Sequence, residues 1–306
     1  MKPLSNTECS ENLKAISGAA FCPGSFGEIL QGMLPSGEKF LVNLKIKSNS
    51  RAAFKIPGGS FARNSKYDFT RLHDKSRACV DIFLRENGVT SDYGLFIESE
   101  LPCGAGLSSS TADMTASLYA CSEALGISIS KEKIDSIISS IEPGDGLHYE
   151  GTAAYLHEEG RLIFNINYIP GYQILAVNTG PEINTLEFNQ KNYSFLESER
   201  IQYEKLLKDV KAALENRDDL AIAFISTKSA LLWQKILYKK EIPILIEASE
   251  KYGGIGIVNC HSGNSSGILF SRETDLRQAE LELKKYFNPK NISIYETLDS
   301  LSEKKI

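Results

Sequence analysis

Apolar residues along the chain follow two spacings, and these spacings separate predicted strands from predicted helices. Between residues 15 and 56, short apolar runs alternate with turn residues such as Pro23-Gly24 and Pro35-Ser-Gly37. The clearest strand patterns there are residues 39–46 and 51–56. The first part of the chain is therefore predicted to form an antiparallel sheet.

Helical spacing begins after a polar loop at residues 57–70. Residues 74–85 carry apolar side chains three and four positions apart, and the same spacing continues over residues 114–125 and 130–141. Gly126 stands where a helix C-terminal cap belongs. These patterns predict three helices after the first strands.

The second half of the chain begins with a different pattern. Residues 152–166 read as a hairpin, and the break at Ile169-Pro170-Gly171 follows it. Residues 172–177 then form a strand pattern, and residues 194–251 are almost continuously helical, interrupted near residues 216–219 and at Pro243. The break predicts two domains, residues 1–169 and residues 170–306.

The end of the chain completes the second predicted domain. Two apolar runs flank a Gly- and Ser-rich loop, a helix is predicted over residues 274–287, and a strand over residues 292–295. This β-β-α-β order is typical of a ferredoxin-like plait. The single tryptophan, Trp233, lies on a helix face and is best explained as core packing.

Composition excludes several classes of protein. The 306 residues are 42% hydrophobic and 24% charged, which is typical of a soluble chain with enough apolar material for a core. A net charge of −5 and the lack of a basic cluster argue against a nucleic-acid partner. No apolar run reaches the ~18 residues of a membrane span, and the polar start lacks the apolar core of a signal peptide, so we expect a cytoplasmic protein. The six cysteines show no C-x-x-C pair or zinc-ligand spacing, and we expect reduced thiols.

The strongest candidate site lies between residues 101 and 114. An apolar run at residues 95–97 predicts a strand, a loop with Gly104 and Gly106 follows, and a helix starts at once. The first turn of a helix presents unpaired N–H groups and a partial positive charge, so this order predicts an anion site suited to phosphate. The residues expected to form it are Pro102, Gly104, Ala105, Gly106, Leu107, Ser108, Ser109 and Ser110.

The consecutive hydroxyls of this stretch add donors for phosphate oxygens and at least one oxygen ligand for Mg²⁺. The alternative interpretation is a serine-rich helix cap, with Ser109 or Ser110 at the N-cap and Asp113 in a position that resembles a capping box. A Walker A loop is excluded because no Lys follows the second glycine. The dinucleotide fingerprint is also excluded, since Ser109 stands at its third glycine position.

The stretch resembles the second motif of the GHMP kinases, P-x-x-x-G-L-G-S-S-A. Five residues match this motif in order, while Ser108 and Thr111 replace its usual Gly and Ala. The form Ser-Ser-Thr-Ala-Asp at residues 109–113 is closer still to the L-threonine kinases associated with propanediol utilisation and cobalamin assembly. The matching residues are Pro102, Gly106, Leu107, Ser109 and Ser110. The motif register makes Ser110 the Mg²⁺ ligand and Ser109 a phosphate donor.

Two further segments extend the resemblance. Residues 23–28 resemble the first GHMP motif, and Gly27-Glu-Ile-Leu-Gln-Gly32 is similar to the threonine-kinase form. Residues 253–267 resemble the third motif, and Gly267-Ile-Leu-Phe270 belongs to the same similarity. Taken without the resemblance, the first segment could be a hairpin turn and the third a flexible loop between two strands. The resemblance implies that the acceptor substrate is bound by Gly24, Ser25, Glu28, His261, Ser262 and Gly263. Many family members carry Lys or Arg where Ser25 stands, so no cationic helper is expected there.

The loop Glu142-Pro-Gly-Asp-Gly146 presents two acids after a predicted helix. A similar segment in the threonine-kinase branch implies that Asp145 is the catalytic acid–base residue, together with Glu28, and that Glu142 supplies a carboxylate to Mg²⁺. His148 follows within reach of the same pocket and is a candidate for substrate binding. Read alone, the segment could equally be an ordinary acidic turn.

The resemblance as a whole implies an α+β, two-domain GHMP kinase fold, with a ribosomal S5 domain 2-like N-terminal domain and a ferredoxin-like C-terminal domain. It implies a transferase that uses ATP and Mg²⁺ to phosphorylate a small hydroxyl-bearing amino acid, L-threonine first, in cobalamin biosynthesis. A kinase for another hydroxyl acceptor such as homoserine, and a non-catalytic nucleotide-binding sensor of the same fold, remain alternatives. The oligomeric state is left open, a homodimer included.

Overall fold

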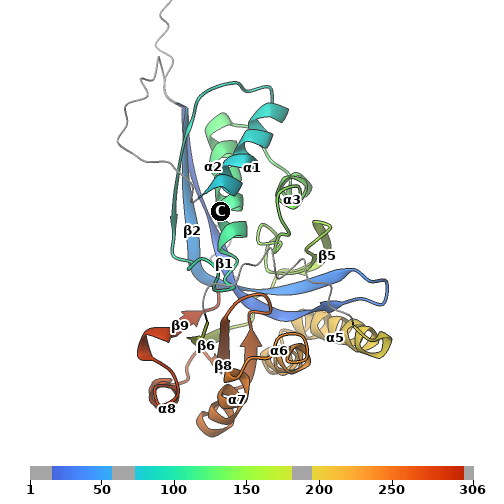
Figure 1. Ribbon diagram of the computed structural model, residues 1–306. Coiled ribbons are helices and arrows are strands. Elements are labelled where there is room, and N and C mark those ends of the chain that lie inside the picture. The colour runs from blue at the N-terminus through green and yellow to red at the C-terminus, as the bar shows by residue number, and fades with distance from the viewer. Residues whose placement is uncertain (1–15, 57–72, 181–194, 300–306) are drawn as a thin grey trace, which may run out of the picture.

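Two long strands form the centre of the fold. The computed structural model describes residues 16–56, 73–180 and 195–299. Strand β1 (Ile16–Met33) and strand β2 (Lys39–Ile56) pair as an antiparallel hairpin, and both bend about midway along their length (Figure 1). The predicted turn at Pro35-Ser-Gly37 closes this hairpin, where the Gly37 amide donates to the Leu34 carbonyl at 2.9 Å.

The predicted interruptions of these strands were wrong. Pro23-Gly24 lies inside β1, and the two runs predicted at residues 39–46 and 51–56 form one strand, β2. Pairing continues because β1 shifts register three times between Pro23 and Leu30. Such bulges accommodate proline and glycine within a strand, and they also turn side chains to new directions.

One sheet of nine antiparallel strands runs through the described part of the chain. The main path has the order β5-β4-β2-β1-β7-β8-β6-β9, and β3 pairs with the other half of β2. Glu28 of β1 pairs with Asn259 of β7, and this contact joins the two halves of the sheet. The division at residues 169 and 170 stays a prediction. The remaining strands are β3 (Gly94–Ser99), β4 (Thr152–Leu156), β5 (Arg161–Ile166), β6 (Tyr172–Asn178), β7 (Gly256–Asn259), β8 (Ser265–Ser271) and β9 (Ile292–Glu296).

Helices α1 (Asp74–Glu86), α2 (Ser109–Leu125) and α3 (Lys131–Ser139) cover one side of the upper β1–β2 region (Figure 1). Their predicted ends agree with the structure where caps form. The Ser130 side chain accepts a hydrogen bond from the Lys133 amide at 3.2 Å, and Gly126 takes the left-handed conformation with φ of 64°. Helix α2 packs so closely on β1 that a Cβ on Gly18 would lie 2.4 Å from the Ala120 carbonyl oxygen.

The other helices lie at the opposite end of the molecule. They are α5 (Glu197–Glu215), α6 (Asp219–Trp233), α7 (Glu241–Tyr252), α8 (Arg277–Leu283) and a short 3₁₀ helix at Pro289–Asn291. Pro243 was wrongly predicted to break a helix, because it lies in the first turn of α7, where proline is tolerated. The predicted helix over residues 274–287 is shorter, and Trp233 is buried in the core as expected.

The α+β fold class is confirmed by this arrangement of helices on an antiparallel sheet. The predicted loop at residues 57–70 lies outside the described residues. In the described segments, no helix combines the length and apolarity that a membrane crossing would need. The cysteines of these segments, at positions 22, 79, 103, 121 and 260, are free thiols.

Candidate active site

The three glycine-bearing segments meet at Gly106. Its carbonyl oxygen accepts a hydrogen bond from the Gly27 amide at 3.2 Å, and the neighbouring Leu107 carbonyl accepts from the Ser25 amide at 3.3 Å. A Cβ placed on Gly263 would lie 2.4 Å from the Gly106 Cα, so the third segment packs directly on the phosphate-loop backbone. The structure therefore brings together segments that are more than 150 residues apart in the chain.

The start of α2 differs from the predicted capping box. The helix begins at Ser109, and Ser108 is its N-cap residue, held in the left-handed conformation with φ of 57° and without a side-chain cap. Asp113 instead accepts a hydrogen bond from the Ser50 hydroxyl at 2.5 Å, and burial raises the pKa of its carboxyl. The capping prediction was wrong because the carboxylate faces β2 rather than the helix start.

The missing cap leaves the helix start open to an anion. Within the described residues, no group accepts a hydrogen bond from the amides of residues 109, 110 and 111. Gly104 and Gly106, with φ of 69° and 85°, turn the preceding loop in conformations that side-chain-bearing residues rarely adopt. A strained Ser108 at this position is typical of functional loops. Open amides on a helix N-terminus can bind phosphate oxygens.

Asp145 lies beside this helix start. The Thr111 hydroxyl donates to its carboxylate at 2.9 Å, and the Asn43 amide group donates to its backbone carbonyl at 3.0 Å. Desolvation, and then the nearby charge of Glu28, raise the pKa of Asp145 to about 7, while the bond from Thr111 acts in the opposite direction. A carboxylate with this pKa can accept a proton near neutral pH.

Glu142 is the second acid of the loop and also reaches the helix start. Its two carboxylate oxygens accept hydrogen bonds from the Ser110 hydroxyl and from the Lys75 ammonium group of α1. The described residues hold no cluster of three metal-binding side chains. Ser110 and Glu142 nonetheless supply oxygen donors next to the open amides, and Mg²⁺ usually takes one or two protein oxygens together with phosphate oxygens. These residues fit such an ion.

Glu28 is held by a buried chain of hydrogen bonds. Its carboxylate accepts from the His261 amide at 3.0 Å and lies 2.7 Å from His261 Nδ1, while Ser229 Oγ lies 2.9 Å from Nε2. The backbone amide of Gln31 donates to Ser229 Oγ at 3.3 Å. Because an ionised carboxylate can only accept, His261 donates through Nδ1 to Glu28, and its Nε2 shares a hydrogen bond with Ser229.

The two histidines predicted to bind substrate, His261 and His148, have different partners in the structure. His261 is fully buried and both ring nitrogens have partners, so it positions Glu28. His148 packs on the Tyr149 ring, and its Nε2 lies 2.9 Å from Asp135 of α3. No described hydrogen bond joins His148 to Glu28 or Asp145, and its substrate role stays a prediction.

Several residues of the site were missed in the sequence. Asn43 pairs with Glu28 across the β1–β2 hairpin and supports Asp145. The buried Lys239 ammonium group donates to the side chain of Asn259 and to two carbonyls of the third segment, at 2.7 to 3.2 Å, and burial lowers its pKa. Lys75 and Ser229 complete the set. None stands in a motif, so no local signal could have found them.

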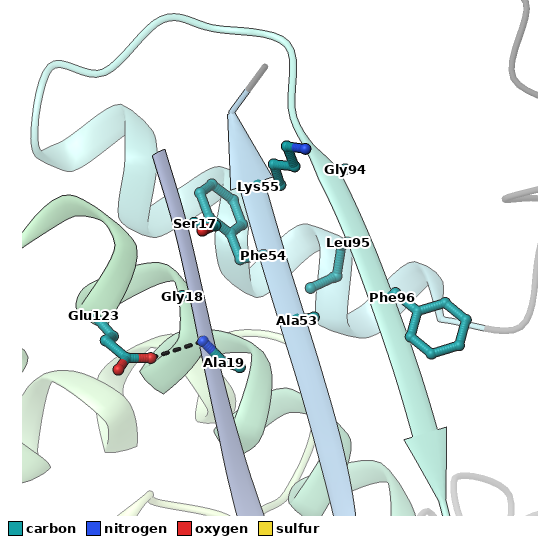
Figure 2. Close-up of a pocket in the computed structure, with 10 residues that line it drawn as sticks. All are labelled: Ser17, Gly18, Ala19, Ala53, Phe54, Lys55, Gly94, Leu95, Phe96 and Glu123. Carbon is teal, nitrogen blue, oxygen red and sulfur yellow. Dashed lines mark hydrogen bonds between the residues drawn. The ribbon is translucent and has the colours of Figure 1, made fainter. Parts of the chain in front are cut away.

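The groove shown in Figure 2 is separate from this site. Its volume is about 620 Å³, and it lies at the outer ends of β1, β2 and β3 beside Glu123 of α2. Glu123 accepts a hydrogen bond from the Ala19 amide at 2.7 Å there. None of the predicted site residues lines this groove.

Comparisons with known proteins agree with the motifs. Residues 74–153 match the family model described as the GHMP kinases N terminal domain. The chain is 24% identical to an L-threonine kinase of Citrobacter freundii over 258 residues, which cover 83% of this chain and 86% of that protein. It is 23% identical to an L-threonine kinase of Salmonella typhimurium over 259 residues, 83% of each chain.

Solved structures share the fold at lower identity. A homoserine kinase from Cytophaga hutchinsonii superposes with a TM-score of 0.68 at 14% identity and covers 96% of this chain and 97% of its own. A mevalonate diphosphate decarboxylase from Staphylococcus aureus has a TM-score of 0.69 at 14% identity, with 93% and 96% covered. The resemblance seen in the motifs is thereby confirmed: this chain has the fold of the GHMP kinases, and its residues 74–153 match the model of their N-terminal domain.

Proposed function

We propose that this GHMP kinase transfers the γ-phosphoryl group of ATP to the side-chain hydroxyl of an amino acid, with L-threonine as the first candidate and O-phospho-L-threonine as the product. The observation that supports this most strongly is the Thr111–Asp145 hydrogen bond. It holds the acid–base candidate beside the open amides of residues 109–111, so that the base and the phosphate site share one helix turn.

The proposed mechanism depends on alignment and charge rather than covalent catalysis. Mg²⁺-ATP supplies the phosphoryl group and neutralises the developing charge when it is bound. The glycine loop and the amides of α2 would hold the phosphates, and Ser110 and Glu142 would hold the metal ion. Asp145 accepts the proton of the acceptor hydroxyl, and Glu28 orients the acceptor.

The choice of L-threonine rests on two relatives. The proteins from Citrobacter freundii and Salmonella typhimurium are L-threonine kinases and align over most of their length. The fold alone does not decide the reaction, since it is shared with a mevalonate diphosphate decarboxylase. A neighbour described as MDDEF in complex with MVAPP, AMPPCP and magnesium supports the choice of a Mg²⁺-nucleotide as cofactor. The cobalamin pathway remains a prediction from the resemblance, and a cytoplasmic location remains a prediction from the hydrophobic pattern of the sequence.

Homoserine is the second candidate acceptor, because homoserine kinases from two organisms share the fold. The experiment that separates the acceptors is a coupled ADP-release assay with ATP, Mg²⁺ and each hydroxyl-bearing amino acid in turn. We expect L-threonine to give the highest kcat/KM. Faster release with homoserine would make homoserine the acceptor in place of L-threonine. No ADP release with any of the amino acids would favour the sensor hypothesis instead.

A further inference from the structure

We infer that Lys75 is a nucleotide-binding residue that pairs with Glu142 in the nucleotide-free protein and passes to the phosphates when Mg²⁺-ATP arrives. This inference rests on the proposed function and adds to it a residue that lies outside all three motifs. Lys75 belongs to the first turn of α1, and its ammonium group forms an ion pair with Glu142.

The first argument comes from the hydrogen-bond partners of the Glu142 carboxylate. Glu142 is 7% exposed, and each of its carboxylate oxygens accepts a hydrogen bond, one from the Ser110 hydroxyl and the other from Lys75. A metal ion on this carboxylate would lie beside the Lys75 ammonium group, and the two positive charges would repel each other. Lysine is the donor that can leave, because its charge sits on a flexible four-carbon stem, whereas Ser110 is fixed in α2.

The second argument comes from the charged side chains near the start of α2. Glu28, Asp145 and Glu142 bring three acids close to the start of α2, and among the ion pairs of the described residues Lys75 is the one lysine or arginine that reaches any of them. Without Lys75, Glu142 would be a buried and unpaired charge in the absence of metal. Lys75 therefore balances the charge of Glu142 in the nucleotide-free protein.

The third argument comes from the exposure of Lys75 and its position near the start of α2. Its side chain is 39% exposed, so it can move, and the Glu142 carboxylate that it contacts touches the second residue of α2. Once Mg²⁺ takes Glu142, the phosphates on the amides of α2 lie next to the released ammonium group. A charge-assisted bond to a phosphate oxygen then replaces the one to the carboxylate.

The test uses Lys75→Met, which removes the charge and keeps an apolar stem, and Lys75→Arg, which keeps the charge. The matched control is Lys131→Met, because Lys131 also lies in the first turn of a helix, is 38% exposed and pairs with a glutamate, Glu150. Two properties are measured on the full chain: the rise of the thermal midpoint with MgCl₂ alone, at fixed ionic strength, and the Kd of a non-hydrolysable ATP analogue with Mg²⁺.

Opposite changes are expected in the two measurements. Lys75→Met should gain a stabilisation by Mg²⁺ alone that the unmodified protein lacks, since no ammonium group then repels a cation at Glu142, and should bind the Mg²⁺-nucleotide roughly 10- to 100-fold more weakly. Lys75→Arg and Lys131→Met should behave like the unmodified protein in both measurements.

Weaker nucleotide binding by Lys75→Met without a gain of Mg²⁺ binding would overturn the inference. A Lys75→Met variant that behaves like the unmodified protein in both measurements would also overturn it. If Lys75→Met does not fold, Lys75→Gln replaces it with the same expectations. The metal titration does not depend on an acceptor, so failure of the proposed function would show separately, as a lack of phosphorylated product.

Discussion

Glu28 and Glu142 are equally buried, each 7% exposed, but they are held in different ways. The partner of Glu28 is His261, which is completely buried and fixed in turn by Ser229 and by Trp233, whose ring nitrogen donates to the His261 carbonyl at 3.0 Å. The partner of Glu142 is the partly exposed Lys75. This difference agrees with the proposed roles, because a carboxylate that orients an acceptor needs a permanent support, whereas one that receives a metal ion needs a partner that can leave.

Asp145 lies between these two acids, and its replacement should have the largest effect. Asp145→Asn keeps a side chain that can bond to Thr111 but removes the proton acceptor. We expect kcat to fall by about 10²- to 10⁴-fold with little change in nucleotide affinity. Steady-state ADP release and calorimetric titration of an ATP analogue measure the two quantities. Undiminished turnover would remove Asp145 from the mechanism.

The buried support of Glu28 is tested by Ser229→Ala. The change leaves His261 Nε2 without its partner in a site closed to water, so Glu28 loses its fixed orientation. We expect kcat/KM for the acceptor to fall by about tenfold while the Kd of the ATP analogue stays the same. Ser226→Ala is the matched control, because Ser226 is equally buried on α6 and its hydroxyl donates to the Ile257 carbonyl at 2.8 Å instead. Equal loss of kcat/KM in both variants would show that Ser229 acts only through stability.

Asp145 also gives the nucleotide-free protein a pH dependence of stability. Its pKa of about 7 in the folded chain lies above the ordinary value of 3.8, so between these values the folded chain holds a proton that the unfolded chain has released. The contribution to the free energy of unfolding is full below about pH 4 and is lost as the pH rises through about 7. Asp145→Asn should therefore unfold at a higher temperature than the unmodified protein at about pH 8, and the difference should disappear near pH 4.

Thermal unfolding followed by circular dichroism measures this difference. Asp209→Asn is a suitable control, because Asp209 pairs with Lys205 on the exposed face of α5 and should give no such trend. A difference between Asp145→Asn and the unmodified protein that stays constant over the whole pH range would contradict the raised pKa.

The glycine turn and the helix that starts after it could be predicted from the sequence because their conformations are local. Gly104, Gly106 and the hydroxyls that follow act through their own backbone and through the helix that starts with them, so their order in the chain carries the signal. The hairpin turn at Pro35, the cap at Gly126 and the start of a helix at residue 130 were predicted for the same reason.

The supports of the site could not be predicted, because they depend on contacts between distant segments. Asn43 reaches Asp145 because β2 pairs with β4, which follows the Asp145 loop, and Ser229 reaches His261 because α6 packs on β7. Asp113 shows the converse error. Its spacing fits a capping box, but the Ser50 hydroxyl on a neighbouring strand offers a buried partner that the local pattern does not reveal.

The central claim is that the acids and the open helix start form one phosphoryl-transfer site. The measurement that tests it most directly is the parallel quantification, by ³¹P NMR, of ADP and O-phospho-L-threonine formed from ATP, Mg²⁺ and L-threonine by the unmodified protein and by Asp145→Asn. We predict equal amounts of the two products with the unmodified protein and almost none with the variant. ADP without the phosphorylated amino acid, or equal yields from both proteins, would contradict the account.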